Sequence, residues 1–391
     1  MVATVVYAHC EGFCESRMIA VILQVMIGLV LLTQGVVLLI NLAHRRRRMA
    51  SFEGASIPCM AVLVPVRNER HNLPRLLDAL KAQSVAPNAI LIYDDESTDG
   101  SPEWLKQHAP AYGVRLVPTV AKPDGWTGKA WACYQLGNAA LDTGVERLLF
   151  LDADVEPERD CLRWLGQAMG QFPDATLFTV IPRLVPAGIG DALLHQVMMT
   201  SLFTLLPLPL AEAHPNPAFA FANGQCLAYR ATAYAQDQPH QVVAASVLDD
   251  VGIAQLIKQR RQSSSQTAQI IILHGVRYLR TYMYRRFSEA VEGYSKNAVA
   301  LCRGVVPALA IGLAMMMVYW LPLVWGSPVW RVGCIGVSVL LFGVSGWCVG
   351  LPFGYGLLYP LSIALALGVL TRSLFWNLRG AIRWKGRLYP R

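Results

Sequence analysis

Residues 18–43 form an uncharged, apolar stretch of 26 residues, and four arginines follow it at positions 45–48. A helix of this length spans the roughly 30 Å hydrocarbon core of a bilayer. The stretch before it holds more acidic than basic residues, unlike the basic start of a cleaved signal peptide. The pattern therefore predicts a transmembrane anchor, with residues 1–17 as a short extracytoplasmic N-terminus and 44–57 as a basic cytoplasmic linker.

Two further uncharged stretches lie near the C-terminus, over residues 304–326 and 332–371. The longer one fits two helices that are separated by a break near 351–356. We expect C-terminal transmembrane helices over 304–371 and a basic interfacial tail over 372–391. Three crossings would place this tail outside, against its positive charge, whereas two crossings and a re-entrant or interfacial segment would keep it inside. The sequence leaves this number open and predicts a multi-pass protein of the cell membrane with a cytoplasmic central domain.

The composition agrees with this division of the chain. Of the 391 residues, 54% are apolar and only 15% are charged, against about 25% in a soluble domain. The net charge of +8 comes from the four arginines and from six basic residues in the tail; without these ten, 24 basic and 26 acidic residues remain. The main domain is thus near neutral, which argues against a nucleic-acid partner, and the apolar excess argues against a disordered chain or a coiled coil.

Residues 58–300 alternate short β-rich runs with helical patterns, as expected for an α/β domain with parallel strands. We predict strands at 60–66, 89–93, 114–118 and 147–151 and a helix at 69–83. Ligands bind at the carboxyl ends of strands in open α/β sheets. The acidic residues that follow the second and fourth strands are therefore candidates for a binding site.

Asp152 and Asp154 follow the fourth predicted strand directly. Two carboxylates at this spacing suit a divalent cation, which in turn holds phosphate oxygens and offsets the charge of a departing diphosphate. The alternative is a capped turn. The second strand ends at Asp94 and Asp95, within a run of four acidic residues in six that ends before Gly100. A carboxylate there would accept hydrogen bonds from a uridine, and the alternative is a helix cap.

Two further short motifs carry charge at predicted helix starts. Gly128 and Lys129 open a helix, where an anion such as phosphate is favoured; the spacing is not that of a P-loop. Asp249 and Asp250 precede another helical pattern, and capping explains a carboxylate at that position as well. Beside a metal site, Asp250 would instead serve as a general base toward an acceptor hydroxyl.

Taken together and in this order, the motifs resemble those of the family 2 glycosyltransferases, whose catalytic domain has the GT-A fold. The resemblance covers residues 58–300. Smaller motifs resemble bacterial carotenoid glycosyltransferases, although hopanoid-associated transferases share the Gly-Trp-Thr-Gly-Lys stretch. These motifs are Gly125-Trp126-Thr127-Gly128-Lys129, Met283-Tyr284, Glu292-Gly293-Tyr294-Ser295-Lys296-Asn297 and Trp384-Lys385-Gly386-Arg387-Leu388-Tyr389.

The resemblance implies an α/β, GT-A nucleotide-diphospho-sugar transferase fold and an inverting transfer from a UDP-linked sugar with Mg²⁺ or Mn²⁺. Asp152 and Asp154 would bind nucleotide and metal, and Asp250 would be the base. Asp249 stands where many members have glutamate. A Gln-x-x-Arg-Trp motif of processive members is missing, which favours a single transfer over polymer synthesis. Besides Asp152 and Asp154, the nucleotide-sugar site would comprise residues of the first two strand ends and of the helix start at 128: Pro65, Val66, Arg67, Asn68, Glu69, Asp94, Asp95, Gly128 and Lys129.

A domain anchored at both ends suits a lipid-soluble acceptor, for which we expect a carotenoid. Hopanoids, glycerolipids and polyprenyl phosphates are the alternatives within this reaction class. Nucleotidyl transfer and a non-catalytic nucleotide-sugar-binding membrane protein are the alternatives outside it. The broken apolar run 202–210, Phe219 and Phe221 are candidate acceptor contacts, with core packing as the other interpretation.

Overall fold

The computed structural model describes residues 2–49, 52, 54–263, 269–380, 382–384 and 387–389, with the side chains of 2–16, 261–263 and the last two segments left out. Parts of the predicted N-terminus, linker and basic tail therefore lie outside the described residues. The predicted anchor falls within one continuous helix, α1 (Val2–Arg48), which also includes most of the predicted N-terminus and the four arginines.

A mixed seven-stranded sheet forms the centre of the α/β domain, in the order β3-β2-β1-β4-β8-β6-β9. All neighbouring pairs are parallel except those of β8, which runs antiparallel to β4 and β6. The strands are β1 (Met60–Val66), β2 (Ala89–Asp94), β3 (Val114–Leu116), β4 (Arg147–Leu151), β6 (Leu177–Ile181), β8 (Cys226–Arg230) and β9 (Ile270–His274). A small second sheet contains β5 (Val155–Pro157), β10 (Leu279–Thr281) and β7 (Arg183–Leu184), and β11 (Ile382–Trp384) pairs with β12 (Arg387–Tyr389).

Both faces of the large sheet are covered, because alternate residues of its strands point to opposite sides. On β1, Val62 and Val64 pack with one set of helices, whereas Ala61 and Leu63 pack with the other. The first set is α2 (Leu73–Lys81), α3 (Ser101–His108) and α5 (Cys161–Gln171). The second includes α4 (Gly128–Leu141), α6 (Ile189–Leu205), α8 (Ala231–Asp237) and α10 (Asp249–Ser263). Shorter helical segments are η1 (Ala109–Tyr112), α7 (Leu208–Ala213), η2 (Pro217–Phe219) and α9 (Pro239–Val242).

Three predicted elements have other boundaries in the structure, and one of them, β2, extends by a single residue to Asp94. The helix expected over 69–83 is shorter, since a turn that starts at Asn68 (φ 56°) precedes α2 and Pro74 stands in its first turn. The strand expected over 114–118 ends at Leu116.

The C-terminal part is helical throughout its apolar stretches. Its elements are α11 (Phe287–Leu301), α12 (Val305–Met315), the π-turn η3 (Met316–Trp320), α13 (Leu321–Val324), α14 (Pro328–Trp347), η4 (Phe353–Leu358) and α15 (Tyr359–Arg379). The expected break near 351–356 falls between α14 and α15. Within the described residues, four helical stretches are long and apolar enough to cross a membrane: Arg17–Arg48, Val305–Val324, Pro328–Trp347 and Phe353–Arg379.

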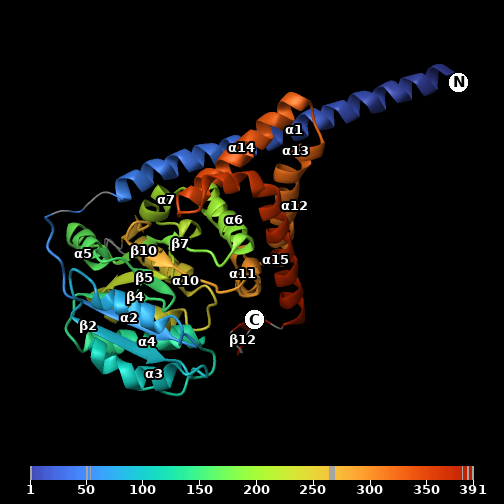
Figure 1. The fold of residues 1–391 in the computed structure, drawn as a ribbon. Helices are drawn as coiled ribbons and strands as arrows, with labels where there is room; N and C mark the ends of the chain where they lie inside the picture. Colours follow the sequence, from blue (N-terminus) through green and yellow to red (C-terminus); the bar gives the residue numbers. More distant parts are fainter. Residues whose placement is uncertain are drawn as a thin grey trace.

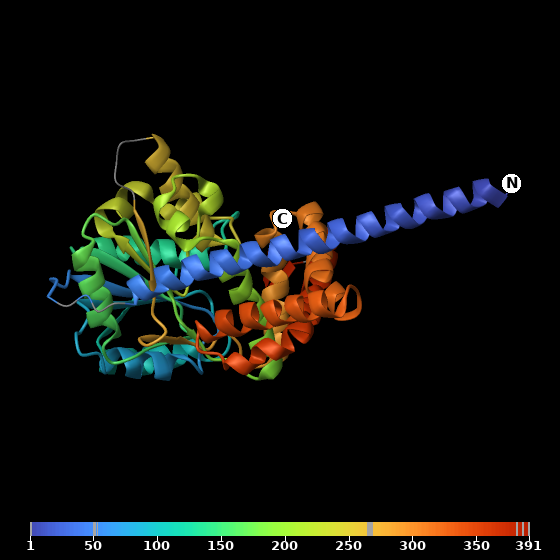
Figure 2. The same cartoon turned by 90° about the horizontal axis from the view of Figure 1, so that it is seen from above.

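These helices pack directly against the α/β domain. Helix α6 contacts α1, α14 and α15, and buried side chains of α1 and α14 belong to the same hydrophobic cluster as Leu63 of β1. Figure 1 shows α1 crossing one end of the domain, with α12 and α15 gathered beside α6 and α11. In Figures 1 and 2, α12 and α15 run across α1 rather than along it. The four stretches therefore do not form a bundle of parallel helices.

Candidate active site

The ends of β1 and β2 place Arg67 beside Asp95. The guanidinium Nη1 donates to the backbone carbonyl of Asp95 at 2.5 Å and lies 3.7 Å from its carboxylate Oδ2. Asp95 is buried and lines a large cavity together with Pro65, Val66, Asn68 and Glu69. The structure thus brings together most residues of the predicted nucleotide site at one edge of the sheet.

Asp95 belongs to the acidic loop over residues 94–99, and two other carboxylates of this loop, Asp94 and Asp99, stabilise the loop itself. Asp94 Oδ1 accepts the N–H of Ser97 at 2.9 Å, and Asp94 is not among the cavity-lining residues. Asp99 accepts from Arg70 N–H and from the hydroxyl and N–H of Ser101. Burial raises the pKa of Asp99, but these hydrogen bonds outweigh it and lower the pKa. Among the loop's carboxylates, Asp95 alone lines the cavity.

Lys129 reaches from the start of α4 to the end of β4. Its Nζ lies 2.7 Å from Oδ1 and 2.9 Å from Oδ2 of Asp152. Burial lowers the pKa of Lys129, but attraction to Asp152 and Asp249 outweighs burial and raises it well above its usual value. The hydroxyl of Thr127 caps α4 by accepting the N–H of Ala130. Gly128 is buried at the helix start and does not line the cavity.

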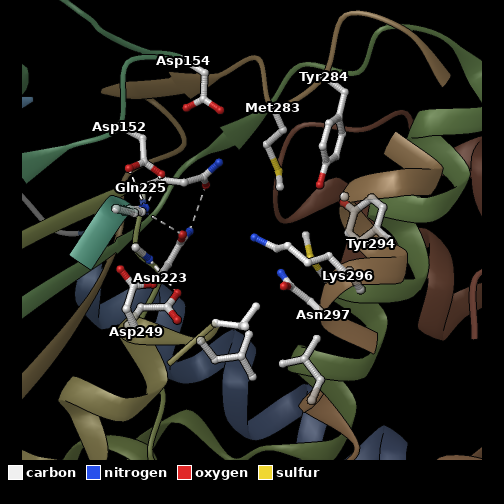
Figure 3. Close-up of a pocket in the computed structure, with 18 of the residues that line it drawn as sticks. Asp152, Asp154, Asn223, Gln225, Asp249, Met283, Tyr284, Tyr294, Lys296 and Asn297 are labelled. Atoms are coloured by element: carbon white, nitrogen blue, oxygen red, sulfur yellow. Dashed lines mark hydrogen bonds and ion pairs between the residues drawn. The ribbon is translucent and has the colours of Figure 1, made fainter. Parts of the chain in front are cut away.

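Asp152 and Asp154 both line the cavity, and Figure 3 shows them on the same wall. Their backbone is held by neighbouring segments, since Asp152 N–H donates to Gln225 O and Asp154 O accepts from Tyr282 N–H. The described residues contain no group of three or more His, Cys, Asp or Glu side chains able to hold a metal ion. Two protein carboxylates suit Mg²⁺, which is typically bound by one or two of them together with phosphates of the substrate.

Asp250 lies at the start of α10, and both oxygens of its carboxylate accept backbone hydrogen bonds. Oδ2 accepts Gly224 N–H at 2.9 Å and Oδ1 accepts Val251 N–H at 2.8 Å. A Cβ at Gly224 would lie 3.3 Å from Oδ2 of Asp250 and 3.4 Å from Lys129 Nζ, so glycine allows the close approach of this loop. Burial and the neighbouring Asp249 raise the pKa of Asp250 to about 6, while Lys129 and the hydrogen bonds act in the opposite direction.

The segment before β8 contributes polar side chains that the sequence analysis missed. Asn223 Nδ2 donates to Gln225 Oε1 at 3.2 Å, and Gln225 Nε2 donates to the hydroxyl of Thr281 at 2.7 Å. Both residues line the cavity beside Asp152 (Figure 3). Asn-Gly-Gln has no charge and is typical of an ordinary turn, so no sequence signal distinguished it.

The cavity has a volume of about 1060 Å³, and it is lined by polar side chains in one part and by apolar side chains in another. One end carries the carboxylates described above. The other end is apolar and is lined by α6, α12 and α15, through side chains that include Leu202, Leu205, Ile311, Met315, Val369 and Leu370. Of the predicted acceptor contacts, Leu202 and Phe221 line the cavity, whereas Leu210 and Phe219 do not; the Phe219 ring packs against His214.

Residues 61–234 match the family model for glycosyl transferase family 2. A 4,4'-diaponeurosporenoate glycosyltransferase of Staphylococcus haemolyticus is 26% identical over 314 residues, which are 77% of this chain and 76% of that one. Its counterpart in Staphylococcus aureus strain USA300 is 34% identical over 97 residues, 25% of this chain and 24% of that one.

Among solved structures, a mannosyltransferase from Pyrobaculum calidifontis in complex with GDP-Man and Mn²⁺ is 16% identical, with a TM-score of 0.49 and coverage of 91% and 99% of the two chains. The family match and the mixed sheet confirm the predicted fold class, and the relatives confirm the resemblance to carotenoid glycosyltransferases. The chain is a glycosyltransferase, and its residues 61–234 match glycosyl transferase family 2.

Proposed function

We propose that this protein transfers one sugar, with inversion, from a UDP-sugar to a long apolar acceptor in the membrane. The observation that carries the proposal is the continuity of the cavity. The same space contacts the carboxylates Asp152 and Asp250 and the apolar side chains of α12 and α15, which are candidate membrane helices. A soluble acceptor would not require an apolar extension of this kind, whereas a lipid-soluble one would.

The donor would lie along the ends of β1, β2 and β4. The carboxylate of Asp95 is placed to accept hydrogen bonds from a uracil, and Arg67 fixes its orientation from the neighbouring strand. Asp152 and Asp154 would hold Mg²⁺ or Mn²⁺ together with the diphosphate. When bound, such a cation offsets the negative charge of the leaving diphosphate. Lys129 supplies a further positive charge on the same wall.

Asp250 would act as the general base toward an acceptor hydroxyl. A pKa of about 6 leaves the carboxylate mostly ionised at neutral pH and more basic than an ordinary aspartate. The backbone N–H groups of Gly224 and Val251 hold both oxygens, so the carboxylate is oriented before the acceptor binds. We propose a carotenoid as the acceptor, because the relatives are named as carotenoid glycosyltransferases.

The arrangement of the helices bears on the membrane topology. Figure 1 shows α12 leading away from the catalytic domain and α14 leading back toward it. A hairpin that enters and leaves the bilayer on one side would keep the basic tail on the same side as the arginines of α1, in agreement with the positive-inside rule. We therefore favour one full crossing by α1 and a re-entrant or interfacial C-terminal region in the cell membrane, with the catalytic domain in the cytoplasm.

Mass spectrometry of membrane lipids and pigments after incubation with a labelled UDP-sugar tests this function. Asp250→Asn should reduce transfer by about 100-fold or more and leave UDP binding intact, because it removes the base without altering the donor site. Asp142→Asn, an exposed position at the end of α4, is the matched control and should keep full activity. Full transfer by Asp250→Asn would contradict the assignment of the base. Absence of any glycosylated lipid with the wild-type protein would contradict the function.

A further inference from the structure

Four polar side chains form a cluster on the cavity wall that faces Asp152 and Asp249 (Figure 3). Tyr284 lies between β10 and α11. The other three members, Tyr294, Lys296 and Asn297, lie on α11. Nothing in the donor site or in the assignment of the base uses this cluster.

Two of its polar atoms are buried and have no hydrogen-bond partner among the described residues. They are the hydroxyl of Tyr294 and Oδ1 of Asn297. Buried polar atoms without a partner are uncommon, because each lowers the stability of the fold. Positions 294 and 297 are three residues apart on a helix, so both side chains lie on the same face. A ligand that forms hydrogen bonds with both atoms would offset the stability that the fold loses by leaving them unpaired.

The side chains of the cluster are held in place by packing within the protein, so the cluster is preorganised for a ligand. A Cβ at Gly293 would lie 2.4 Å from the hydroxyl of Tyr284, so glycine at this position admits that hydroxyl against α11. The rings of Tyr284 and Tyr294 pack edge to face, with centroids 5.5 Å apart. Nδ1 of the buried His195 lies 3.0 Å from Asp191 Oδ1, and the His195 ring packs against Tyr294.

The cluster lies across the cavity from Asp152 and Asp249 (Figure 3), and α11, which carries three of its members, also lines the cavity with apolar side chains. Leu301 at the end of α11 and Cys302 directly after it also line the cavity, as do Val369 and Leu370 of α15. An apolar chain that lies along these residues would bring its terminal group to Tyr294 and Asn297. The same terminal group would then face Asp249 and Asp250 across the cavity.

We propose that Tyr294 and Asn297, flanked by Tyr284 and Lys296, bind the oxygen-bearing terminus of the acceptor. This inference rests on the proposed function and adds to it the part of the site that positions the acceptor. The recognised chemistry is an oxygen atom that accepts a hydrogen bond from the Tyr294 hydroxyl at the end of a long apolar chain. Before reaction, a hydroxyl terminus would donate its one proton to Asn297 Oδ1, and it would turn this hydrogen bond to Asp250 for the transfer. A carboxylate terminus would gain from the charge of Lys296.

Steady-state kinetics with Tyr294→Phe tests the site, with a polyene alcohol and a polyene acid of equal length as acceptors. Since the hydroxyl has no hydrogen-bond partner among the residues that the structure describes, its removal should leave the melting temperature unchanged or slightly higher. Loss of one hydrogen bond to the acceptor should raise the acceptor KM about 5- to 10-fold and leave the affinity for UDP unchanged. Asn297→Leu, of similar size, should also raise the acceptor KM.

Tyr319→Phe is the matched control, because the Tyr319 hydroxyl bonds Gln34 at 3.0 Å and does not line the cavity. It should lower the melting temperature and leave the acceptor KM unchanged. A rise in acceptor KM for the alcohol or for the acid supports the site, and a larger effect of Lys296→Met on the acid identifies a carboxylate terminus. An unchanged acceptor KM in Tyr294→Phe, or a rise in the donor KM instead, would overturn the inference while the proposed function stands. No transfer to either acceptor by the wild-type protein would overturn the proposed function itself.

Discussion

Lys129 at the start of α4 forms an ion pair with Asp152 at the end of β4, and its Nζ contacts both carboxylate oxygens, at 2.7 Å and 2.9 Å. Lys129 Nζ and the Asp250 carboxylate approach the same point, since a Cβ built on Gly224 would lie within 3.4 Å of both. The lysine therefore acts electrostatically on two parts of the site at once. It neutralises a carboxylate of the proposed donor site and lowers the pKa of the proposed base.

Lys129→Met should shift the pH dependence of transfer to higher pH. A general base works when it is deprotonated, so activity should rise with pH through the Asp250 pKa of about 6 and level off above it. Removal of the positive charge raises this pKa, and the acidic limb of kcat/KM should move upward with it. A pH series between 5 and 8 measures the shift, and Lys106→Met on the exposed face of α3 should leave the limb in place.

Asp249→Asn should shift the same limb in the opposite direction. The charge of Asp249 raises the pKa of Asp250, so its removal lowers that pKa and extends activity to lower pH. Two variants that shift the limb in the same direction would show that Asp250 is not the group that titrates.

Metal binding should depend on the nucleotide. The proposed metal ligands are two carboxylates, Asp152 and Asp154, and Asp152 is paired with Lys129. We expect Mn²⁺ to bind weakly to the protein alone and much more tightly when UDP is present, since the diphosphate supplies further oxygen ligands. Electron paramagnetic resonance of free Mn²⁺ with and without UDP measures this. Equally tight binding in both conditions would argue for a complete metal site in the protein.

Ala366→Phe should restrict the length of the acceptor. Ala366 lies on α15 at the apolar end of the cavity, and a phenyl ring there would occupy space that the far end of a long chain needs. The KM for long polyenes should rise at least several-fold, while shorter acceptors of the same chemistry should react as before. Leu361→Phe, exposed on the same helix and outside the cavity, is the control. An equal effect on long and short acceptors would contradict the proposed direction of the chain.

Asn41→Leu should destabilise the junction between α1 and the catalytic domain. The fully buried amide of Asn41 donates to the carbonyls of Phe203 and Leu206 at 2.9 Å and 2.8 Å, and its Oδ1 accepts Leu208 N–H at 2.7 Å. Loss of these bonds leaves buried backbone groups unpaired, at a cost of about 2–4 kcal/mol. Thermal unfolding in detergent should show a lower midpoint. Thr33→Val, on the exposed face of α1, should leave the midpoint unchanged.

Some residues of the proposed site could be predicted from the sequence more readily than others. Asp152, Asp154 and Asp250 stand at the ends or starts of strongly patterned elements, and such positions in an α/β sheet converge at one edge whatever the details of packing. Asp94 illustrates the limit of this argument. It belongs to the same acidic run as Asp95, but its carboxylate folds back onto Ser97. The hydrogen bond of Asp94 and the backbone turn at Glu96 (φ 55°) are visible only in the structure.

The sequence by itself determined the long apolar N-terminal helix, the apolar C-terminal stretches, the α/β domain and the order of its acidic strand ends, because each follows from local composition and periodicity. Tertiary structure alone decided that Asn223 and Gln225 border the site, that Lys129 pairs with Asp152 and that α12 and α15 extend the cavity. These contacts join residues that are far apart along the chain. They depend on how α6 and α11 pack against the C-terminal helices, and no local pattern carries that information.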